Sequence, residues 1–328
     1  MSGPPAGRTV AANGIELHVV EEGEGPVVVL VHGWPELAWS WRHQLPALAA
    51  AGYRAVAPDM RGYGRSSCPA AVEAYAIEEL CGDVVGLLDA LGIERAVVVG
   101  HDWGSMVAWN VALRYPERLH GVVGMSVPFL PRPKRPPVAN FDAQHPGTFF
   151  YISYFQEPGV ADADLGRDPR AAVTRVMLAL QSGTPDTGFL GADDGRGLLE
   201  RLPPEPDDMP GWITRQELDV YVEEFTRTGF TGGINWYRNM DGNWERSAHL
   251  AGSKVEVPAL FVAGADDPVI VAWSPARMEG WLTDPRGVVL VPGAGHWVQQ
   301  ERPGEVNEAL LGFFGGLGLA PGPAAPSS

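Results

Sequence analysis

One carboxylate in this chain stands where a reactive group could be exposed. Asp102 is the central residue of Gly100-His101-Asp102-Trp103-Gly104, which follows an apolar run at 96–99 and precedes a helical pattern at 106–114. A strand that turns sharply into a helix crowds its backbone, and glycine tolerates the crowding because it lacks a Cβ. The pattern therefore predicts a strand, a tight turn that presents Asp102, and a helix. By itself it is also compatible with an ordinary turn, in which aspartate and glycine are common.

An aspartate at such a turn would perform different chemistry from the serine that more often occupies it. A carboxylate is already ionised at neutral pH, so it can attack without a base to activate it. Its attack on a saturated carbon would give an ester, which water can open at the carboxyl carbon. A serine would give an ether, which water cannot cleave. The sequence thus indicates displacement at an sp³ carbon through a covalent ester on Asp102.

A second motif could supply hydrogen-bond donors to this carboxylate. His32-Gly33-Trp34-Pro35 comes directly after the apolar run at 27–31. A turn at this point can direct the backbone N–H of Trp34 into the site, where the N–H of Trp103 would join it in a two-donor oxyanion hole. To aim that N–H at Asp102, we expect the Trp34-Pro35 peptide to be cis. The alternative is a simple turn, because glycine and proline are frequent in turns.

Two further motifs could supply an acid and a base. Ala263-Gly264-Ala265-Asp266-Asp267-Pro268 ends the apolar run at 259–263, and Gly293-Ala294-Gly295-His296-Trp297 ends the run at 287–291. Such strand ends are where active sites form in open α/β sheets. We favour Asp267 as the acid from its place before Pro268 and keep Asp266 as the alternative. His296 then completes the order nucleophile, acid, base, and His101 is expected to point away from the site.

The elements that must position these groups alternate between strand and helix. Asn13-Gly14 between alternating runs at 8–12 and 15–20 predicts a hairpin. The apolar runs expected to form the other strands are 27–31, 54–57, 96–99, 121–126, 259–263 and 287–291. Helical patterns cover 39–51, 76–91, 106–114 and 304–314. This alternation predicts an α/β protein with a mostly parallel sheet that helices cover on both faces.

The alternation stops at Pro128. Residues 128–137 contain five prolines, and the following segment to about 250 has clustered aromatic residues, helical patterns and no convincing buried strand. We therefore predict a core at 1–127, a mainly helical lid at 128–250 and a second part of the core at 251–319. The Pro- and Ala-rich tail at 320–328 is expected to be disordered.

Composition excludes several classes of protein. The 328 residues carry a net charge of −16, which disfavours binding to nucleic acid or to anionic membranes. Cys68 and Cys81 are too few for a disulfide framework or a four-cysteine metal site. The amino terminus does not resemble a signal peptide, and no apolar stretch is long enough to span a membrane. We expect a cytoplasmic protein whose chemistry requires neither a metal nor an organic cofactor.

Together these motifs resemble those of the α/β-hydrolases of the epoxide hydrolase family, over nearly all of residues 7–316. Residues 32–35 resemble its oxyanion motif, 100–104 its nucleophile motif, and 59–66 (DMRGYGRS) its loop after the fourth strand. In the lid, 149–159 (FFYISYFQEPG) and 235–239 (NWYRN) are similar to its two tyrosine segments. The resemblance implies an α/β-hydrolase fold with an inserted helical lid.

The resemblance also implies roles for residues in the lid. Tyr151 and Tyr237 match the proton donors of the family, while Tyr154 matches a structural aromatic and is the alternative donor. A departing epoxide oxygen stays tethered as an alkoxide, a poor leaving group that a tyrosine O–H can protonate. The side chains expected to contact the substrate are those of Trp34, Pro35, Trp103 and Phe149.

The expected reaction is hydrolysis of a small apolar epoxide to a vicinal diol. Asp102 would form the hydroxyalkyl ester, and His296, oriented by Asp267, would activate the water that cleaves it. The nearest alternative is a haloalkane dehalogenase, although the chain has Trp34 where many of those enzymes place a halide-binding asparagine. An acyl-ester hydrolase and a non-catalytic binding protein are more distant alternatives. The sequence leaves open which epoxide is used, with what selectivity, and whether the chain is a monomer or a homodimer.

Overall fold

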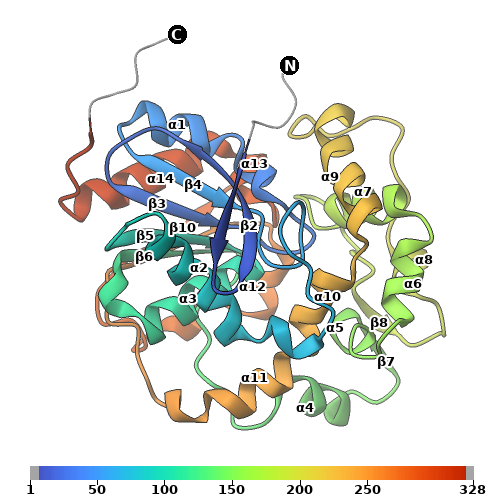
Figure 1. The fold of residues 1–328 in the computed structure, drawn as a ribbon. Coiled ribbons are helices and arrows are strands. Elements are labelled where there is room, and N and C mark those ends of the chain that lie inside the picture. Colours follow the sequence, from blue (N-terminus) through green and yellow to red (C-terminus); the bar gives the residue numbers. More distant parts are fainter. Residues whose placement is uncertain (1–6, 323–328) are drawn as a thin grey trace.

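The centre of the molecule is one eight-stranded sheet, seen in a computed structural model that describes residues 7–322. The strands are β1 (Arg8–Ala12), β2 (Ile15–Glu22), β3 (Val27–Val31), β4 (Arg54–Pro58), β5 (Ala96–His101), β6 (Leu119–Met125), β9 (Ala259–Gly264) and β10 (Pro285–Val291). Their order is β1-β2-β4-β3-β5-β6-β9-β10 (Figure 1). Strand β2 is antiparallel to β1 and β4, and the remaining pairs are parallel. The predicted α/β class is confirmed.

The amino-terminal hairpin forms at the predicted turn. Asn13 and Gly14 have φ of 46° and 75°, and Ala12 pairs with Ile15 across the turn. Positive φ at both central residues is the geometry that suits the twist of a two-residue hairpin.

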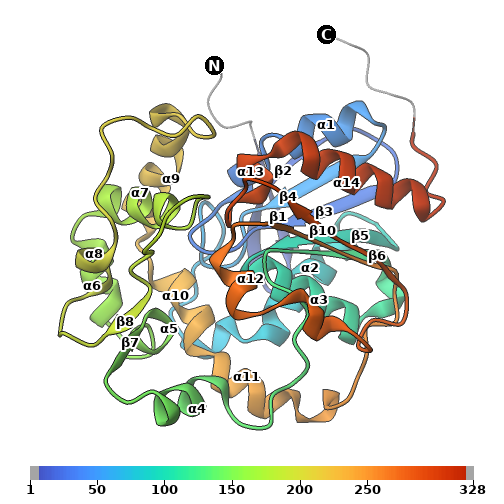
Figure 2. The ribbon, with the colours of Figure 1, turned by 180° about the vertical axis from the view of Figure 1, so that it is seen from behind.

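Alternate residues of the central strands face two different layers of helices. Val29 and Val31 belong to a core shared with α2 (Ile77–Ala90) and α3 (Trp103–Arg114). Val28 and Leu30 belong to a second core shared with α1 (Gln44–Ala50) and α14 (Pro303–Gly316), which Figure 2 shows on the other side of the sheet. Because successive side chains of a strand point to opposite faces, a strand covered on both faces is apolar throughout.

One helix predicted as continuous is interrupted in the structure. The pattern at 39–51 is split into a 3₁₀ turn at Ala38–Trp41 and the helix α1 at Gln44–Ala50. Pro46 explains the break, because its ring would clash with the carbonyl of residue 42 and it has no N–H for a continuous helix. It is tolerated in the first turn of α1, where the N–H has no partner within the helix.

The segment between β6 and β9 is mainly helical and lies to one side of the sheet (Figure 1). Its helices are α4 (Pro137–Gln144), α5 (Tyr151–Tyr154), α6 (Val160–Gly166), α7 (Pro169–Ala179), α8 (Leu198–Arg201), α9 (Arg215–Thr228), α10 (Thr231–Arg238) and α11 (Met240–Arg246). Below, residues 128–250 are called the lid, and these limits stay a prediction. The segment also contains β7 (Thr148–Phe150) paired antiparallel with β8 (Leu190–Ala192), which the sequence did not predict because three residues are too few for a periodic signal.

The sheet brings the four candidate motifs together. They follow the carboxyl ends of β3, β5, β9 and β10, and these strands all run in the same direction. Parallel strands end at one edge of a sheet, so the motifs meet there. The remaining short elements are η2 (Val72–Tyr75), η3 (Pro116–Arg118), η4 (Ser247–Leu250), α12 (Pro268–Ala272), η5 (Pro275–Met278) and α13 (Val298–Glu301).

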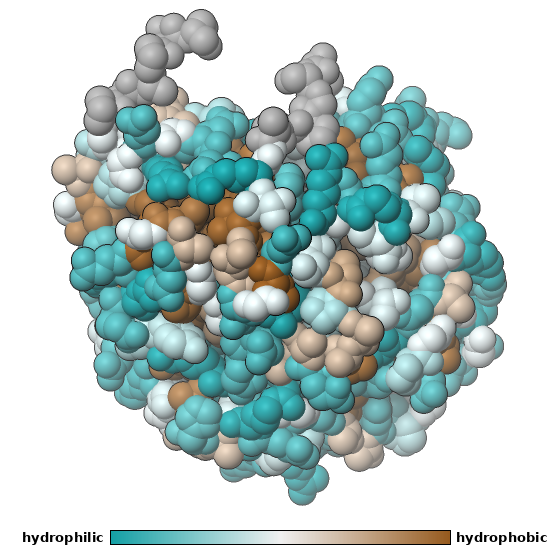
Figure 3. Space-filling view, viewed as in Figure 1, coloured by the Kyte–Doolittle hydropathy of each residue, from teal (hydrophilic) through white to brown (hydrophobic). Residues whose placement is uncertain are grey.

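The surface is that of an acidic globular protein. Hydrophilic residues cover most of the face in Figure 3, with apolar residues scattered among them. Within residues 7–322, no helix has the length and apolar character needed to cross a membrane.

Of the tail predicted to be disordered, 323–328 lie outside the described residues, whereas Gly322 donates its N–H to the carbonyl of Gly52 at 2.8 Å.

Candidate active site

Asp102 occupies a strained turn between β5 and α3. Its φ of 53° and ψ of −119° are unfavourable for a residue with a side chain, and such strain is concentrated at functional sites. A Cβ at Gly100 would collide with the backbone of Gly104, and one at Gly104 would collide with the backbone of Val31. The two glycines are therefore required by close packing, as the sequence predicted for this turn.

A backbone N–H already binds the Asp102 carboxylate. Trp34 donates to Asp102 Oδ1 at 2.9 Å, and the Trp34-Pro35 peptide is cis as predicted. A Cβ at Gly33 would collide with the same carboxylate. Trp103 is the first residue of α3, so its N–H has no acceptor within the helix and is free for an anion at the turn.

Asp267 and His296, the predicted acid and base, lie together beside Asp102. His296 Nε2 lies 3.5 Å from Asp102 Oδ2, and His296 Nδ1 lies 3.1 Å from Asp267 Oδ2. Asp267 is fully buried and accepts the N–H of Val269 at 2.8 Å. Asp266 is exposed and accepts a hydrogen bond from Ser182 instead. The geometry thus brings Asp267, and not Asp266, to the histidine.

The surroundings of His296 determine its charge. Burial disfavours the imidazolium, but the carboxylates of Asp267 and Asp102 outweigh this and raise the pKa of His296 to about 10. A histidine that holds its proton this firmly is a poor base. If Asp102 became an ester, it would lose its charge, and the pKa of His296 would fall toward the range in which a general base operates.

This coupling predicts a pH effect on the free protein. In Asp102→Asn we expect a lower pKa for His296, measured by NMR of ¹⁵N-labelled imidazole, while Asp266→Asn leaves it unchanged. Because the folded state binds the proton more tightly, the stabilisation is full below the ordinary pKa near 6.5 and is lost as pH rises through about 10. The free energy of unfolding should therefore decline less over this window in Asp102→Asn. An unchanged pKa in that variant would contradict the coupling.

Two tyrosines of the lid lie close to one another near Asp102. Tyr151 opens α5 and Tyr237 lies in α10, and their ring centroids are 5.6 Å apart. The ring of Tyr237 also packs against that of Trp103 at 5.1 Å. Burial and the charge of Asp102 raise the pKa of Tyr151; burial, the neighbouring Tyr151 and Asp102 do the same for Tyr237. Both hydroxyls therefore keep their protons. Tyr154, the alternative donor, instead donates to Asp164 at 3.2 Å.

One expected contact residue is not brought to the site. The ring of Phe149 packs against Tyr154 at 5.4 Å and lies under the Arg201 guanidinium at 4.0 Å. Phe155, and not Phe149, lies against the aromatic residues of the site. Its ring centroid is 5.1 Å from those of Trp34 and Tyr237 and 5.5 Å from that of Tyr151. Helical spacing explains the difference, because Phe155 lies four residues after Tyr151 and therefore on the same face.

A buried carboxylate that the sequence analysis missed holds the loops together. Glu36 is fully buried and accepts the N–H of Gly33 at 3.0 Å and a hydrogen bond from His101 Nδ1 at 2.6 Å. Its other oxygen accepts from Gln299 and Gln300. Burial would raise the pKa of Glu36, but His101 outweighs it and holds that pKa at about 2. The only sequence signal was its place directly after the motif at 32–35.

His101 points away from Asp102, as expected, and yet contacts the backbone of His296. Its Nε2 lies 2.7 Å from the carbonyl oxygen of His296, so His101 bridges Glu36 and the turn that carries the base. His32 is also fully buried and accepts the N–H of Met60 at Nε2 at 2.9 Å. Its pKa is lowered by burial, which suits a neutral structural histidine.

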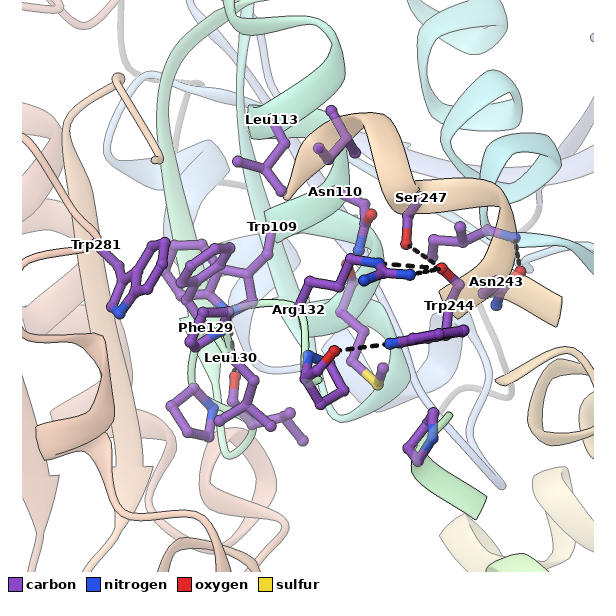
Figure 4. Close-up of a pocket in the computed structure, with 18 of the residues that line it drawn as sticks. Trp109, Asn110, Leu113, Phe129, Leu130, Arg132, Asn243, Trp244, Ser247 and Trp281 are labelled. Atoms are coloured by element: carbon purple, nitrogen blue, oxygen red, sulfur yellow. Dashed lines mark hydrogen bonds between the residues drawn. The ribbon is translucent and has the colours of Figure 1, made fainter. Parts of the chain in front are cut away.

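A largely apolar cavity of about 320 Å³ lies beside the site, between α3, the proline-rich segment after β6, and α11 (Figure 4). Its α3 wall is formed by Trp103, Met106, Trp109, Asn110 and Leu113. Arg132 crosses it, donates to the carbonyl of Trp244 at 3.0 and 3.2 Å, and lies 4.0 Å from the centroid of the Trp244 ring. Trp103, the residue after Asp102, lines this cavity, whereas Asp102 and His296 do not.

Comparisons with known proteins agree with this geometry. The family model described as the alpha/beta hydrolase fold matches residues 26–152. Epoxide hydrolase A of Mycobacterium tuberculosis is 53% identical, over 97% of this chain and 99% of that protein. The crystal structure of epoxide hydrolase A from Mycobacterium thermoresistibile matches with a TM-score of 0.92 and 53% identity, over 97% of this chain and all of that one. Bifunctional epoxide hydrolase 2 of Mus musculus is 42% identical over 91% of this chain, which spans 53% of that longer protein.

Proposed function

The chain belongs to the epoxide hydrolases of the α/β-hydrolase fold, which convert an epoxide and water to a vicinal diol, and we propose that Asp102 is its nucleophile. The observation that carries this assignment is the convergence on one carboxylate of a backbone donor, a buried acid–base pair and two protonated tyrosines. Trp34 N–H lies 2.9 Å and His296 Nε2 lies 3.5 Å from the two Asp102 oxygens.

In the first half-reaction, the epoxide alkylates Asp102. Tyr151 and Tyr237 hold the epoxide oxygen by hydrogen bonds, and an Asp102 oxygen attacks one ring carbon. The carbon–oxygen bond of the ring breaks as the ester bond forms. The departing oxygen takes a proton from a tyrosine, which the raised pKa of both hydroxyls keeps available. No base is needed, because the nucleophile is already ionised.

In the second half-reaction, water cleaves the ester. His296 takes a proton from water as that water attacks the carboxyl carbon of Asp102. The oxyanion that forms accepts hydrogen bonds from the N–H groups of Trp34 and Trp103. The diol leaves with a proton from His296, and Asp267 stabilises the imidazolium in the interval. Asp102 is regenerated as a carboxylic acid, and loss of its proton balances the reprotonation of the tyrosinate left by the first half-reaction. The loss of the Asp102 charge in the ester lowers the pKa of His296, so that its imidazole can be neutral and accept the proton in this step.

A small set of substrates tests the assignment. Styrene oxide and a long-chain fatty epoxide should each give a diol, whereas a bromoalkane should release no bromide. The dehalogenase alternative is not favoured by the comparisons, and Trp34 supplies no side-chain amide to a halide. Release of bromide with no action on either epoxide would overturn the proposal.

We further propose that the cavity beyond Trp103 receives the apolar arm of the substrate. The cavity begins at the residue next to the nucleophile and is lined mainly by apolar side chains, which favours burial of a hydrocarbon chain. Trp34, Pro35, Trp103 and Phe155 would then enclose the reacting end. Phe149, which the sequence placed in this group, is replaced by Phe155 for the reason given above.

Filling the cavity should discriminate between long and short substrates. Asn110→Trp is expected to lower kcat/KM for the long-chain epoxide by about 10- to 100-fold, the scale of a few lost methylene contacts. It should change kcat/KM for styrene oxide by less than about twofold. Asn110→Ala, which leaves the space open, is the matched control. An equal loss on both substrates would indicate a folding defect and would contradict the assignment of this cavity.

We also propose that the protein works in the cytoplasm. Both cysteines are free, Cys68 at the surface and Cys81 in the core, which suits a reducing compartment.

A further inference from the structure

One edge of the lid is joined to the turn that carries His296 through backbone contacts. The segment 180–182 follows α7 and lies against 295–297. A Cβ at Gly295 would collide with the backbone of residues 181 and 182, so the two segments are in direct contact there. The N–H of His296 itself donates to the carbonyl of Leu180 at 2.9 Å.

Glu301, the last residue of α13, lies at the centre of this contact and is only 6% exposed. Its Oε2 accepts the N–H of Gly295 at 3.0 Å and the N–H of Ser182 at 3.0 Å. Its Oε1 accepts the N–H of Trp297 at 3.1 Å. One carboxylate thus binds the two residues that flank the base and one residue of the lid.

This carboxylate is held by backbone N–H groups and not by an ion pair within the described part of the chain. Among residues 7–322, no arginine, lysine or histidine side chain forms an ion pair with Glu301. Burial raises the pKa of Glu301, although the three N–H groups and the charge of His296 oppose that shift. A buried carboxylate without an ion-pair partner is costly, which indicates that its three acceptor bonds serve a purpose at this turn.

The other bonds of the turn show what Glu301 adds. Ser126 Oγ donates to the His296 carbonyl at 2.8 Å, and His101 approaches the same oxygen from the core. The core therefore holds the carbonyl of His296, whereas the lid and Glu301 hold the N–H groups of 295, 296 and 297. The orientation of the imidazole depends on both sets of bonds.

We propose that Glu301 is a positioning residue for the hydrolysis of the ester, which it serves by fixing the His296 turn to the lid. The proposal rests on the function proposed above, in which His296 acts only in the second half-reaction. Alkylation requires Asp102 and the tyrosines, and none of these contacts Glu301. Loss of the three acceptor bonds should therefore slow one step and spare the other.

The test is Glu301→Gln, followed in single-turnover reactions that resolve both steps with styrene oxide. The amide has the same size but turns an N–H₂ group toward at least one backbone N–H, so the turn must shift. We expect ester hydrolysis to slow by about 10- to 100-fold, the scale of a displacement of about 1 Å in a reacting group. Alkylation should stay within about twofold of the parent rate, and the ester should accumulate.

Two further variants separate positioning from simple destabilisation. Glu301→Asp keeps both oxygens on a shorter chain and should recover part of the hydrolysis rate. Glu305→Gln changes an exposed glutamate in the first turn of the neighbouring α14 and should leave both steps unchanged. If Glu301→Gln does not fold, Glu301→Asp alone tests the proposal, because its hydrolysis should still slow more than its alkylation.

Other results would overturn the proposal. An equal decrease in both rates, or a lower Tm with both rates unchanged, would mean that Glu301 supports the fold and does not position the base. Failure of the proposed function is distinguishable, because the parent protein would then form no ester on Asp102 at all.

Discussion

His296→Gln mixed with an epoxide is expected to stop at a covalent ester on Asp102. Alkylation needs no base, because the carboxylate is ionised and Trp34 N–H already binds one of its oxygens at 2.9 Å. Hydrolysis does need a base, and the structure places His296 Nε2 3.5 Å from that carboxylate. Loss of general-base catalysis should slow hydrolysis by about 10²- to 10⁴-fold. Intact-protein mass spectrometry should show a gain of one epoxide, and peptide mapping should locate it at Asp102.

The companion variants define what this result means. Asp102→Ala should form no adduct and no diol, because it lacks the proposed nucleophile. The parent protein should show the adduct only transiently. An adduct on a residue other than Asp102, or full turnover by His296→Gln, would refute the assignment of nucleophile and base.

Removing the two lid hydroxyls should abolish ring opening. Tyr151→Phe and Tyr237→Phe each keep the aromatic ring and its packing but lose one O–H. Each should slow alkylation by about 10- to 1000-fold, on the scale of general-acid contributions. The double variant should lose nearly all activity, because an unprotonated alkoxide is a poor leaving group. The two effects need not add, since one donor can partly replace the other. A rapid-mixing measurement of ester formation provides the rates.

The chain offers a matched control for these variants. Tyr154→Phe removes a hydroxyl that donates to Asp164 and faces away from the reaction, so it should alkylate at close to the parent rate. Ester hydrolysis should change little in all three single variants, because it depends on His296 and Asp267. If the double variant alkylates at the parent rate, the lid tyrosines serve only in packing.

The parts of this protein that were predicted from sequence are those whose signal is local. The central parallel strands β3 and β5 are apolar runs because they are covered on both faces, and the turns that follow them contain the glycines that a crowded backbone requires. The placement of Asp102, His296 and the Trp34 turn at one edge of a sheet follows from those local patterns. The hairpin at Asn13-Gly14 follows in the same way, since two adjacent residues specify its turn.

Tertiary structure alone decided the features that depend on burial. Asp266 and Asp267 are neighbours of the same type, and only packing shows that Asp267 is buried against His296 while Asp266 is exposed. Glu36 and Glu301 look like ordinary surface acids in the sequence, yet both are buried acceptors of backbone N–H groups. Their partners are set by contacts between distant segments, as in the bond from lid Ser182 to Glu301. A periodic pattern reports which face of an element is apolar, but it carries no information on which distant backbone will meet a given carboxylate.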